Sequence, residues 1–474
     1  MSRERILFVT GRLAEPSLRE VLRPLAEKVG FEYDVAVLGI SVAALMHVDW
    51  VRRKLAIPTA TSRVVLPGWC GGDLASLTTH FGVLFDLGPK DLFDLPEFFG
   101  RGGRSMPPLV EHSIEILAEI NHAPQLSDED LMRQANAYRQ SGADVIDLGC
   151  VPGESWSEIG RTVKTLREEG FRVSVDSFDR SEVEAAVEAG AELVLSCNRT
   201  NLEWACELPV EFVVIPDDVH DLGSWDHTRH KLQESERQFR LDPVIEPIGF
   251  GFAASLQRYF ETRRQHPDAA MMMGVGNLTE LTEVDSAGVN FLLAAICEEL
   301  TIGSVLATEV INWGCTAVRE FDLARRLVRH SVKNRVLPKH IGGQLVLLRD
   351  PKLHAIGEDG LRQIASRLTD PNFRVFAERG QIHLMNRDGY WHGSDPYEVF
   401  DQMLATVGSL TAEHAFYLGM ELSKARTALT LGKQYIQDES LRWGFLTIDE
   451  VSALARRKHR MGQSDGTDAA SAGS

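Results

Sequence analysis

Short apolar runs that end in a carboxylate or an amide recur along the middle of the chain, and a helical segment follows each one. The runs at 145–147, 173–176 and 193–198 consist largely of aliphatic residues, as expected for parallel strands that are buried on both faces. Asp179 and Ser127 stand where helix caps would lie between such runs. This alternation with short links predicts βαβ units and a parallel sheet.

Further runs raise the number of strands to about eight, at which a parallel sheet closes into a barrel. These runs lie at 114–120, 212–215, 243–246, 271–275 and 304–308. The expected fold class is therefore α/β, with a central (β/α)8 TIM barrel.

The active site of such a barrel lies at the carboxyl ends of its strands, so polar residues at these ends should face one pocket. They are Asn121, Asp147, Asp176, Asn198, Glu246, Asn277 and Glu309. Any one of them could instead form a turn or cap a helix, but this alternative explains so many poorly. A pocket of carboxylates and amides with little fixed positive charge suits a neutral heterocycle that is rich in N–H donors, and a pterin has such edges.

Several segments together resemble the pterin-binding barrel of dihydropteroate synthase. They are Glu119-Ile-Asn121-His-Ala-Pro124, Gly142-Ala-Asp-Val-Ile-Asp147-Leu-Gly149, Ser174-Val-Asp176-Ser, Asn198 and Glu246-Pro-Ile-Gly-Phe-Gly251. From about residue 5 to about residue 450, the chain resembles the dihydropteroate synthase-related proteins found with tetrahydromethanopterin biosynthesis.

This resemblance implies a set of roles for residues of the barrel. Asp176, Asn198 and Glu246 match positions that hold the pterin ring, and Asn121 matches a residue near the diphosphate leaving group. The predicted pterin site also includes Asp147, Gly249 and Gly251. A magnesium ion near Asn121 and an arylamine as second substrate are further implications, and the function would be in tetrahydromethanopterin or folate-type one-carbon metabolism.

The sequence also departs from the synthase pattern. In place of a Ser-Arg-Lys run and an Arg-x-His run, it has Gly274-Val-Gly-Asn277-Leu-Thr and Thr308-Glu-Val-Ile-Asn312, and the second loop has Cys150-Val-Pro-Gly153-Glu154. An anionic leaving group would thus lose cationic partners.

The seventh segment is closer to the Ser-Asn-x-Ser pattern of folate and corrinoid methyltransferases, in which an asparagine lies beside N5 of the pterin. Asn277 would occupy that place and, with Asn121, is a predicted catalytic residue. Three hypotheses stay open: pterin–arylamine condensation, methyl transfer from a reduced pterin, and a pterin carrier or assembly subunit without chemistry of its own.

The flanking regions predict two smaller domains. Residues 1–104 form a Rossmann-like α/β domain, 105–336 the barrel, 337–458 an α+β domain and 459–474 a disordered tail, with the glycine- and proline-rich stretch 99–108 as the first linker. The glycine loop at 68–73 lacks dinucleotide-binding spacing, so a nucleotide site there is disfavoured. In the last domain we expect a strand at 345–348, a hairpin at 374–385 and a helix at about 413–431.

The composition of the chain bears on its binding partners and its compartment. The net charge of −18 disfavours nucleic acid or an anionic membrane as the main partner, since either needs a basic face. The six cysteines are scattered, which is typical of reduced thiols in the cytoplasm. No apolar run approaches the length of a membrane span. Small-molecule partners are therefore expected, with a homodimer left open.

Overall fold

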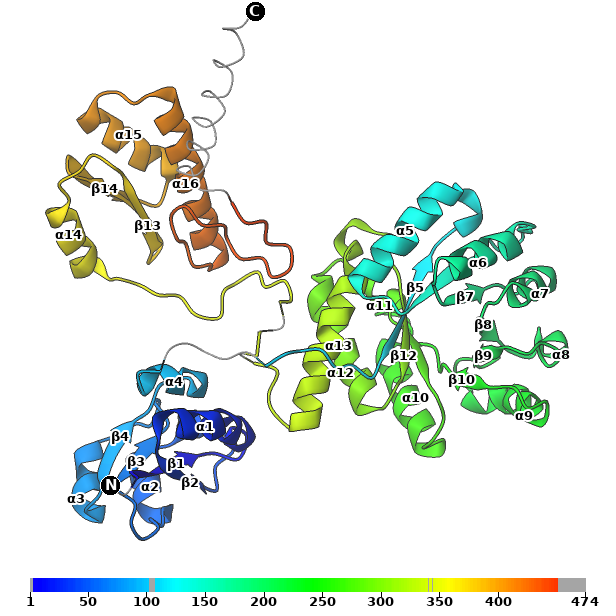
Figure 1. The fold of residues 1–474 in the computed structure, drawn as a ribbon, viewed down its shortest axis with the longest axis horizontal. Helices are drawn as coiled ribbons and strands as arrows, with labels where there is room; N and C mark the ends of the chain where they lie inside the picture. The colour runs from blue at the N-terminus through cyan, green and yellow to red at the C-terminus, as the bar shows by residue number, and fades with distance from the viewer. Residues whose placement is uncertain (1–2, 102–106, 340, 343, 451–474) are drawn as a thin grey trace, which may run out of the picture. The chain divides into compact units, whose positions relative to one another are not determined.

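The chain is organised around three sheets. The computed structural model describes residues 3–101, 107–339, 341–342 and 344–450. It contains two compact units, Met1–Gly343 and Gln344–Ser474. The first unit holds a four-stranded and an eight-stranded sheet, and the second a three-stranded sheet (Figure 1). The predicted tail at 459–474 and residues 102–106 of the predicted linker lie outside the described residues.

The N-terminal sheet is open and parallel, with strand order β2-β1-β3-β4. Its strands are β1 (Arg5–Thr10), β2 (Glu32–Val37), β3 (Arg63–Leu66) and β4 (Leu84–Leu87). Its helices are α1 (Glu15–Val29), α2 (Val48–Lys54), α3 (Leu74–Phe81) and α4 (Leu95–Phe98), with short 3-10 turns at Ala43–Leu45 and Leu92–Asp94. Separate apolar clusters form around Leu77 and around Phe8. The alternation of parallel strands and helices is the Rossmann-like arrangement that the sequence predicts.

The eight-stranded sheet is the predicted barrel. Its strands are β5 (Glu115–Ile120), β6 (Val145–Gly149), β7 (Val173–Asp176), β8 (Leu193–Cys197), β9 (Glu211–Val214), β10 (Phe239–Leu241), β11 (Met272–Gly274) and β12 (Ser304–Ala307). All their pairings are parallel, in the order β10-β9-β8-β7-β6-β5-β12-β11. A parallel bridge between Leu241 and Met271 joins the two ends, with Leu241 N donating to Ala270 O at 2.8 Å. The ring of strands is therefore closed.

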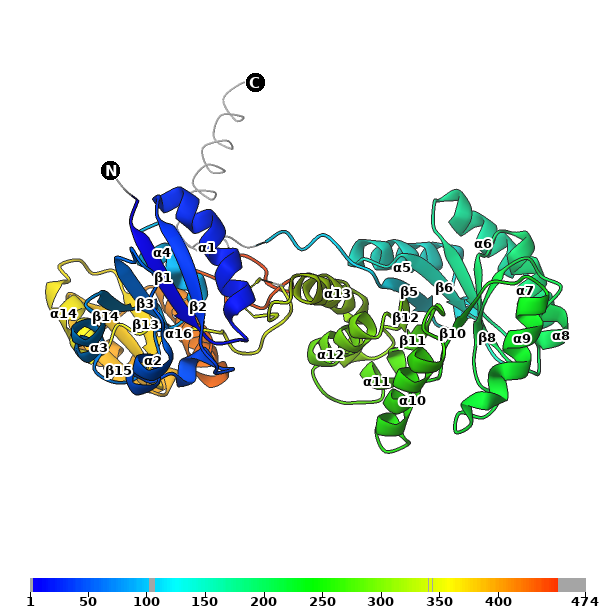
Figure 2. The ribbon, with the colours of Figure 1, turned by 90° about the horizontal axis from the view of Figure 1, so that it is seen from below.

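Helices follow the strands, and most of them lie outside the ring (Figures 1 and 2). They are α5 (Asp128–Ser141), α6 (Ile159–Glu168), α7 (Arg180–Glu188), α8 (Leu202–Ala205), α9 (Asp226–Glu234), α10 (Phe252–Gln265), α11 (Gly276–Thr279), α12 (Ser286–Glu299) and α13 (Ala317–Asn334). Ser127 caps α5 by accepting from Asp130 N at 3.1 Å, and Asp179 caps α7 by accepting from Ser181 N at 2.8 Å. Both of these caps are confirmed, whereas the capping box expected at Ser155-Trp-Ser-Glu158 does not form, since α6 begins after Glu158 without a side-chain cap.

The sixth strand was predicted in the wrong place. We expected it at residues 243–246, but β10 is Phe239–Leu241. Pro243 has no N–H for a ladder, and the Asp242 carboxylate accepts from Val244 N at 2.8 Å, which bends the chain so that Val244 adopts φ 63°. Glu246 therefore lies on a loop beyond the strand.

The interior of the barrel is layered from its amino end upward. At the amino end Arg240 donates to Glu115 Oε2 at 2.7 Å and to Glu211 Oε1 at 3.0 Å, so one guanidinium connects β10 with β5 and β9. The next layer is apolar and consists of Leu117, Val145, Leu193, Leu195, Val213 and Met272, with Leu306 packed against it. Glu119 and Asp147 follow Leu117 and Val145 by two residues on the same inward side of their strands.

The second unit contains an antiparallel sheet in the order β13-β14-β15 with helices α14, α15 and α16. The bounds are β13 (Arg374–Glu378), β14 (Gln381–Asn386), β15 (Gly389–Gly393), α14 (Glu358–Arg367), α15 (Pro396–Val407) and α16 (Ala412–Leu431). The hairpin turns at Arg379 and Gly380, both with positive φ, as the sequence predicts. The predicted strand at 345–348 does not form. Residue Leu347 instead offers its carbonyl to the buried ammonium of Lys433 at 2.8 Å.

In the part of the chain that the structure describes, none of the helices is both long enough and apolar enough to cross a bilayer.

We expect Arg240→Ala to destabilise the barrel by roughly 3 kcal/mol, because Glu115 and Glu211 would lose their shared cation in a largely buried place. Urea unfolding followed by circular dichroism measures this. Arg161→Ala is the matched control, since Arg161 also joins two carboxylates, Asp128 and Glu158, but on the surface. Equal unfolding midpoints for the two variants would show that the ion pairs of Arg240 stabilise the barrel no more than those on the surface.

Candidate functional site

An acidic floor lies at the carboxyl ends of three neighbouring strands. In the parallel register Glu119 of β5 stands beside Asp147 of β6, and Asp147 stands beside Ser174 of β7. One row nearer the mouth, Gly149 stands beside Asp176. Asp147 is fully buried. The strands thus bring the predicted Asp147 and Asp176 together and add Glu119.

Hydrogen bonds satisfy only part of this floor. The Ser174 hydroxyl donates to Asp147 Oδ1 at 2.6 Å, whereas Asp147 Oδ2 is buried without a partner among the described residues. The Asn121 amide nitrogen donates to Glu119 Oε1 at 2.9 Å. Each carboxyl group therefore keeps acceptor capacity that the described residues do not use.

Burial without a cation shifts the pKa values of the floor upward. Burial raises the pKa of Glu119 to about 7, and the nearby charges of Asp176 and Glu280 act in the same direction. Burial also raises the pKa of Asp147 well above its usual range, with Asp176 and Glu119 contributing. The pKa of Asp176 is raised by burial, although a hydrogen bond from Ser196 opposes this shift. The floor can therefore hold protons near neutral pH.

The loop between β10 and α10 places Glu246. The Arg258 guanidinium of α10 donates to Glu246 Oε2 at 2.9 Å, and the same nitrogen donates to Val244 O at 2.8 Å. Ser255, one turn earlier in the helix, accepts from Glu246 N at 3.1 Å. These contacts fix the Glu246 carboxylate as an ion pair in which only Oε1 is left for a ligand.

The two predicted glycines of this loop differ in their roles. Gly251 has φ 121°, and a Cβ there would lie 2.7 Å from Glu246 Oε2. Gly249 has φ 90°, and its Cβ would meet no atom within 4 Å. Gly251 is thus required for the position of Glu246, while Gly249 serves the turn alone.

The single-turn helix α11 lies near both Glu246 and Glu119. Asn277 donates through Nδ2 to Ile245 O at 2.9 Å, which places it next to Glu246. Glu280 follows α11 directly and lies close enough to Glu119 to affect its pKa. The predicted catalytic residue Asn277 is exposed, with its amide held by the neighbouring loop.

Asn198 takes part in a turn and Glu309 in the start of a helix, which are the alternative roles considered for residues at strand ends. The Asn198 carbonyl oxygen accepts from Thr200 N at 2.9 Å, so its amide nitrogen is the group left for a ligand. Glu309 Oε1 accepts from Val318 N at 3.0 Å in the first turn of α13, so we assign it to the helix rather than to the pocket.

Sequence reasoning missed Glu119, Glu280 and Arg258. Glu119 was overlooked because only the polar residue at the end of each predicted strand was considered, although its inward side follows from the period of two that it shares with Leu117. Arg258 comes from a helix, not from a strand end. Nothing in the local pattern marks Glu280, whose position depends on the turn of α11.

The two arginines nearest in sequence to an expected anion site are both paired: Arg199 with Asp217 at 3.3 Å and Arg319 with Asp322 at 3.3 Å. Among the residues described, no three His, Cys, Asp or Glu side chains are grouped so as to hold a metal ion.

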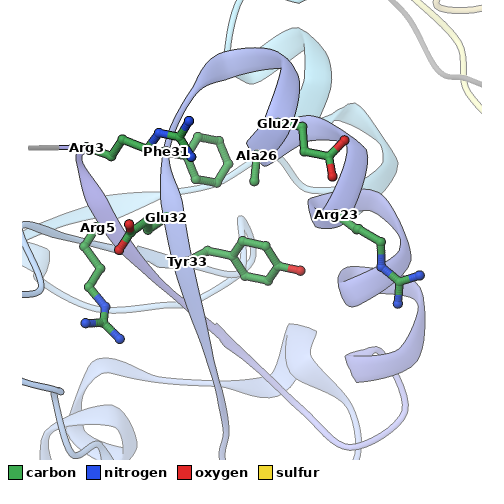
Figure 3. Close-up of a pocket in the computed structure, with 8 residues that line it drawn as sticks. All are labelled: Arg3, Arg5, Arg23, Ala26, Glu27, Phe31, Glu32 and Tyr33. Atoms are coloured by element: carbon green, nitrogen blue, oxygen red, sulfur yellow. The ribbon is translucent and has the colours of Figure 1, made fainter.

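The N-terminal domain has a separate surface pocket (Figure 3). It is lined by Arg3, Arg5, Arg23, Ala26, Glu27, Phe31, Glu32 and Tyr33. The pocket lies where β1 and β2 begin and α1 ends, whereas open parallel sheets bind ligands at the carboxyl ends of their strands. Arg5 is already paired with Asp34 at 2.8 Å. We assign no ligand to this pocket.

Comparison with known proteins gives matches to both flanking domains and to the whole chain. Residues 4–90 match a family model described as a family of unknown function, DUF6513, and residues 367–438 match the model PterinBD-DUF4346. An uncharacterized protein of Methanocaldococcus jannaschii is 26% identical over 530 residues, which cover 92% of this chain and 99% of that protein. The similarity therefore extends over the full domain organisation.

Solved structures that match part of this chain include dihydropteroate synthases. The Yersinia pestis enzyme with a pterine–sulfa conjugate is 17% identical, covers 47% of this chain and 95% of its own, and has a TM-score of 0.38. The Thermus thermophilus enzyme in complex with 4-aminobenzoate is 20% identical, covers 46% and 94%, and has a TM-score of 0.36. The match of residues 367–438 to the PterinBD-DUF4346 model agrees with the predicted resemblance to pterin-binding proteins, but these residues belong to the second unit and not to the barrel. The link to tetrahydromethanopterin stays a prediction.

The raised pKa of Glu119 predicts a pH-dependent stability. Because the folded pKa, about 7, exceeds the unfolded value of 4.5, the native state binds more protons in this window, and the free energy of unfolding falls as pH rises through it. Glu119→Gln should reduce the stability difference between about pH 5 and about pH 8 by up to about 3 kcal/mol. Urea unfolding at both pH values tests this. An unchanged difference would show that Glu119 ionises as freely in the native state as in the unfolded one.

Proposed function

We propose that the barrel binds a reduced pterin at the carboxyl ends of its strands and acts in tetrahydromethanopterin or folate-type one-carbon cofactor metabolism. The observation that carries the proposal is the placement of two acidic residues at the carboxyl end of one barrel: Asp176 at the end of β7, and Glu246 beyond β10, where Arg258 holds its carboxylate. The amino-pyrimidinone edge of a pterin offers parallel N–H donors to such acceptors. The Asn198 amide nitrogen can serve an acceptor on the heterocycle.

The reaction we propose is the condensation of a dihydropterin with an arylamine. The bond between the pterin methylene carbon and a diphosphate oxygen breaks, a carbon–nitrogen bond to the amine forms, and the amine nitrogen releases a proton. Positive charge develops on the pterin as the diphosphate leaves, and the carboxylates of an acidic mouth stabilise it. Asn121 would face the leaving group, and we route no step through a metal.

Apolar side chains at the rim of the barrel mouth support the proposal that the second substrate is aromatic. Exposed apolar side chains occur on several loops that follow the strands: Phe178, Ile248, Phe250, Leu281, Val284 and Val310. These loops lie at the same end of the barrel as the acidic floor. Exposed apolar groups beside a polar pocket mark a binding surface, and an arylamine has a face of matching character.

Methyl transfer from a reduced pterin is a second candidate. It is favoured by Asn277, whose amide is held beside Glu246 by Ile245 O, and by the pairing of Arg199 and Arg319 with acids. A donor near N5 would aid departure of the methyl group.

The binding proposal predicts that Asp176→Ala and Glu246→Gln each weaken the affinity for 6-hydroxymethyl-7,8-dihydropterin, because each removes a charged acceptor for its N–H edge. The loss should be about 1.5–3 kcal/mol, measured by isothermal titration calorimetry. Asp217→Ala is the control, since that carboxylate also follows a strand but pairs with Arg199. If both site variants titrate like the parent protein, the pocket lies elsewhere.

The reaction is tested by incubating the protein with 6-hydroxymethyl-7,8-dihydropterin diphosphate and either 4-aminobenzoate or its ribofuranosyl derivative. A coupled product detected by mass spectrometry, and inhibited by pyrophosphate, is the expected result. Tight pterin binding without product would reject condensation and leave methyl transfer or a carrier role. Under methyl transfer, Asn277→Ala should lower turnover much more than pterin affinity.

A further inference from the structure

The inward residues of β5, β6 and β7 leave one gap in the row nearest the mouth. Asp176 occupies that row on β7, but its partner on β6 is Gly149, which has no side chain to fill its place. Gly149 does not have positive φ, so the backbone does not require glycine there. The position calls for glycine because of the space that a side chain would take.

The Glu119 carboxyl group fills this space. A Cβ built on Gly149 would lie 2.5 Å from Glu119 Oε1, closer than side-chain atoms approach one another. Glu119 comes from the row below, where it stands beside Asp147. Its carboxyl group therefore extends one row toward the mouth, to the level of Asp176.

One oxygen of Glu119 is held and the other is free. Oε1 accepts from Asn121 Nδ2 at 2.9 Å, while the described residues provide no hydrogen-bond partner for Oε2. Asp147 Oδ2, just beneath, is buried and likewise unpartnered. Glu119 itself is only partly buried, so a ligand that enters the mouth can reach its side chain. The unpartnered Asp147 Oδ2 is buried, and such a group is costly unless a proton or a ligand completes it.

We infer that Glu119 is a further ligand-contacting residue: its carboxyl group, admitted by Gly149, forms the floor of the pterin pocket and hydrogen-bonds the heterocycle through Oε2. The inference rests on the proposed pterin binding. It adds a third carboxyl group to Asp176 and Glu246, so the site takes a heterocycle with more hydrogen-bonding groups on its edges than two carboxylates can satisfy.

A double-mutant cycle separates direct contact from support of Asn121. Affinity for 6-hydroxymethyl-7,8-dihydropterin is measured by calorimetry for the parent protein, Glu119→Ala, Asn121→Ala and the double variant. Glu119→Ala should lower affinity about tenfold or more in both backgrounds. A loss that vanishes in the Asn121→Ala background, or no loss at all, overturns the inference.

Gly149→Ala tests the geometry without removing any charge. Its methyl group displaces the Glu119 carboxyl group, so affinity should fall about as far as in Glu119→Ala. Gly303→Ala is the control, because that glycine lies before β12 at the opposite end of the barrel and its Cβ would meet nothing within 4 Å. If Gly149→Ala is folded by circular dichroism and binds like the parent, the inference is wrong.

Failure of the proposed pterin binding gives a different set of affinities from failure of the inference about Glu119. If the parent protein does not bind the dihydropterin, or Asp176→Ala binds as well as the parent, then pterin binding at this mouth fails, and the inference about Glu119 falls with it. If the parent binds, Asp176→Ala weakens binding and the Glu119 and Gly149 variants do not, only the inference about Glu119 is rejected.

Discussion

The placement of ionisable groups within the barrel depends on the apolar layer around Leu117 and Met272. This layer separates the ion pairs of Arg240 at the amino end from the acids at the carboxyl end, so the cations below cannot neutralise the carboxyl groups above. Burial then favours the protonated form of those groups. The result is a barrel with ion-paired carboxylates at its amino end and, at its carboxyl end, a floor of Glu119, Asp147 and Asp176 for which the described residues provide no ion pair.

On the opposite side of the mouth, the carboxylate has a cationic partner. Glu246 is neutralised by Arg258, and the same arginine holds the carbonyl of Val244 in a segment that has left the sheet. Tyr259, the next residue of α10, donates to Asp242 at 2.5 Å at the start of this segment. One face of one helix thus determines the course of a loop that no strand pairing supports. The mouth thus has a carboxylate that is ion-paired with an arginine on this side and carboxyl groups whose pKa values are raised by burial on the other.

Much of the barrel could be predicted from sequence because its strands are continuous apolar runs that end in polar residues. The prediction failed at β10, where Arg240 points into the barrel and interrupts the apolar pattern, while the aliphatic residues at 244–245 imitate a strand. Glu119 was missed because it lies within its strand, two residues before the strand-end residue Asn121 that the prediction considered. The hydrogen bonds around Glu246 could not be predicted from the sequence, because Arg258 belongs to a helix and lies twelve positions further along the chain.

The glycine at position 149 links two positions that are distant in sequence but adjacent across strands. Because the strand backbone there suits any residue, only the length of the side chain at 119 prevents a larger residue at 149. Among homologous sequences the two positions should therefore vary together. A chain with a short residue at 119 can carry alanine or serine at 149, whereas one that keeps glutamate at 119 must keep glycine. Such covariation would mark which relatives share this pocket floor and which have rebuilt it for a different ligand.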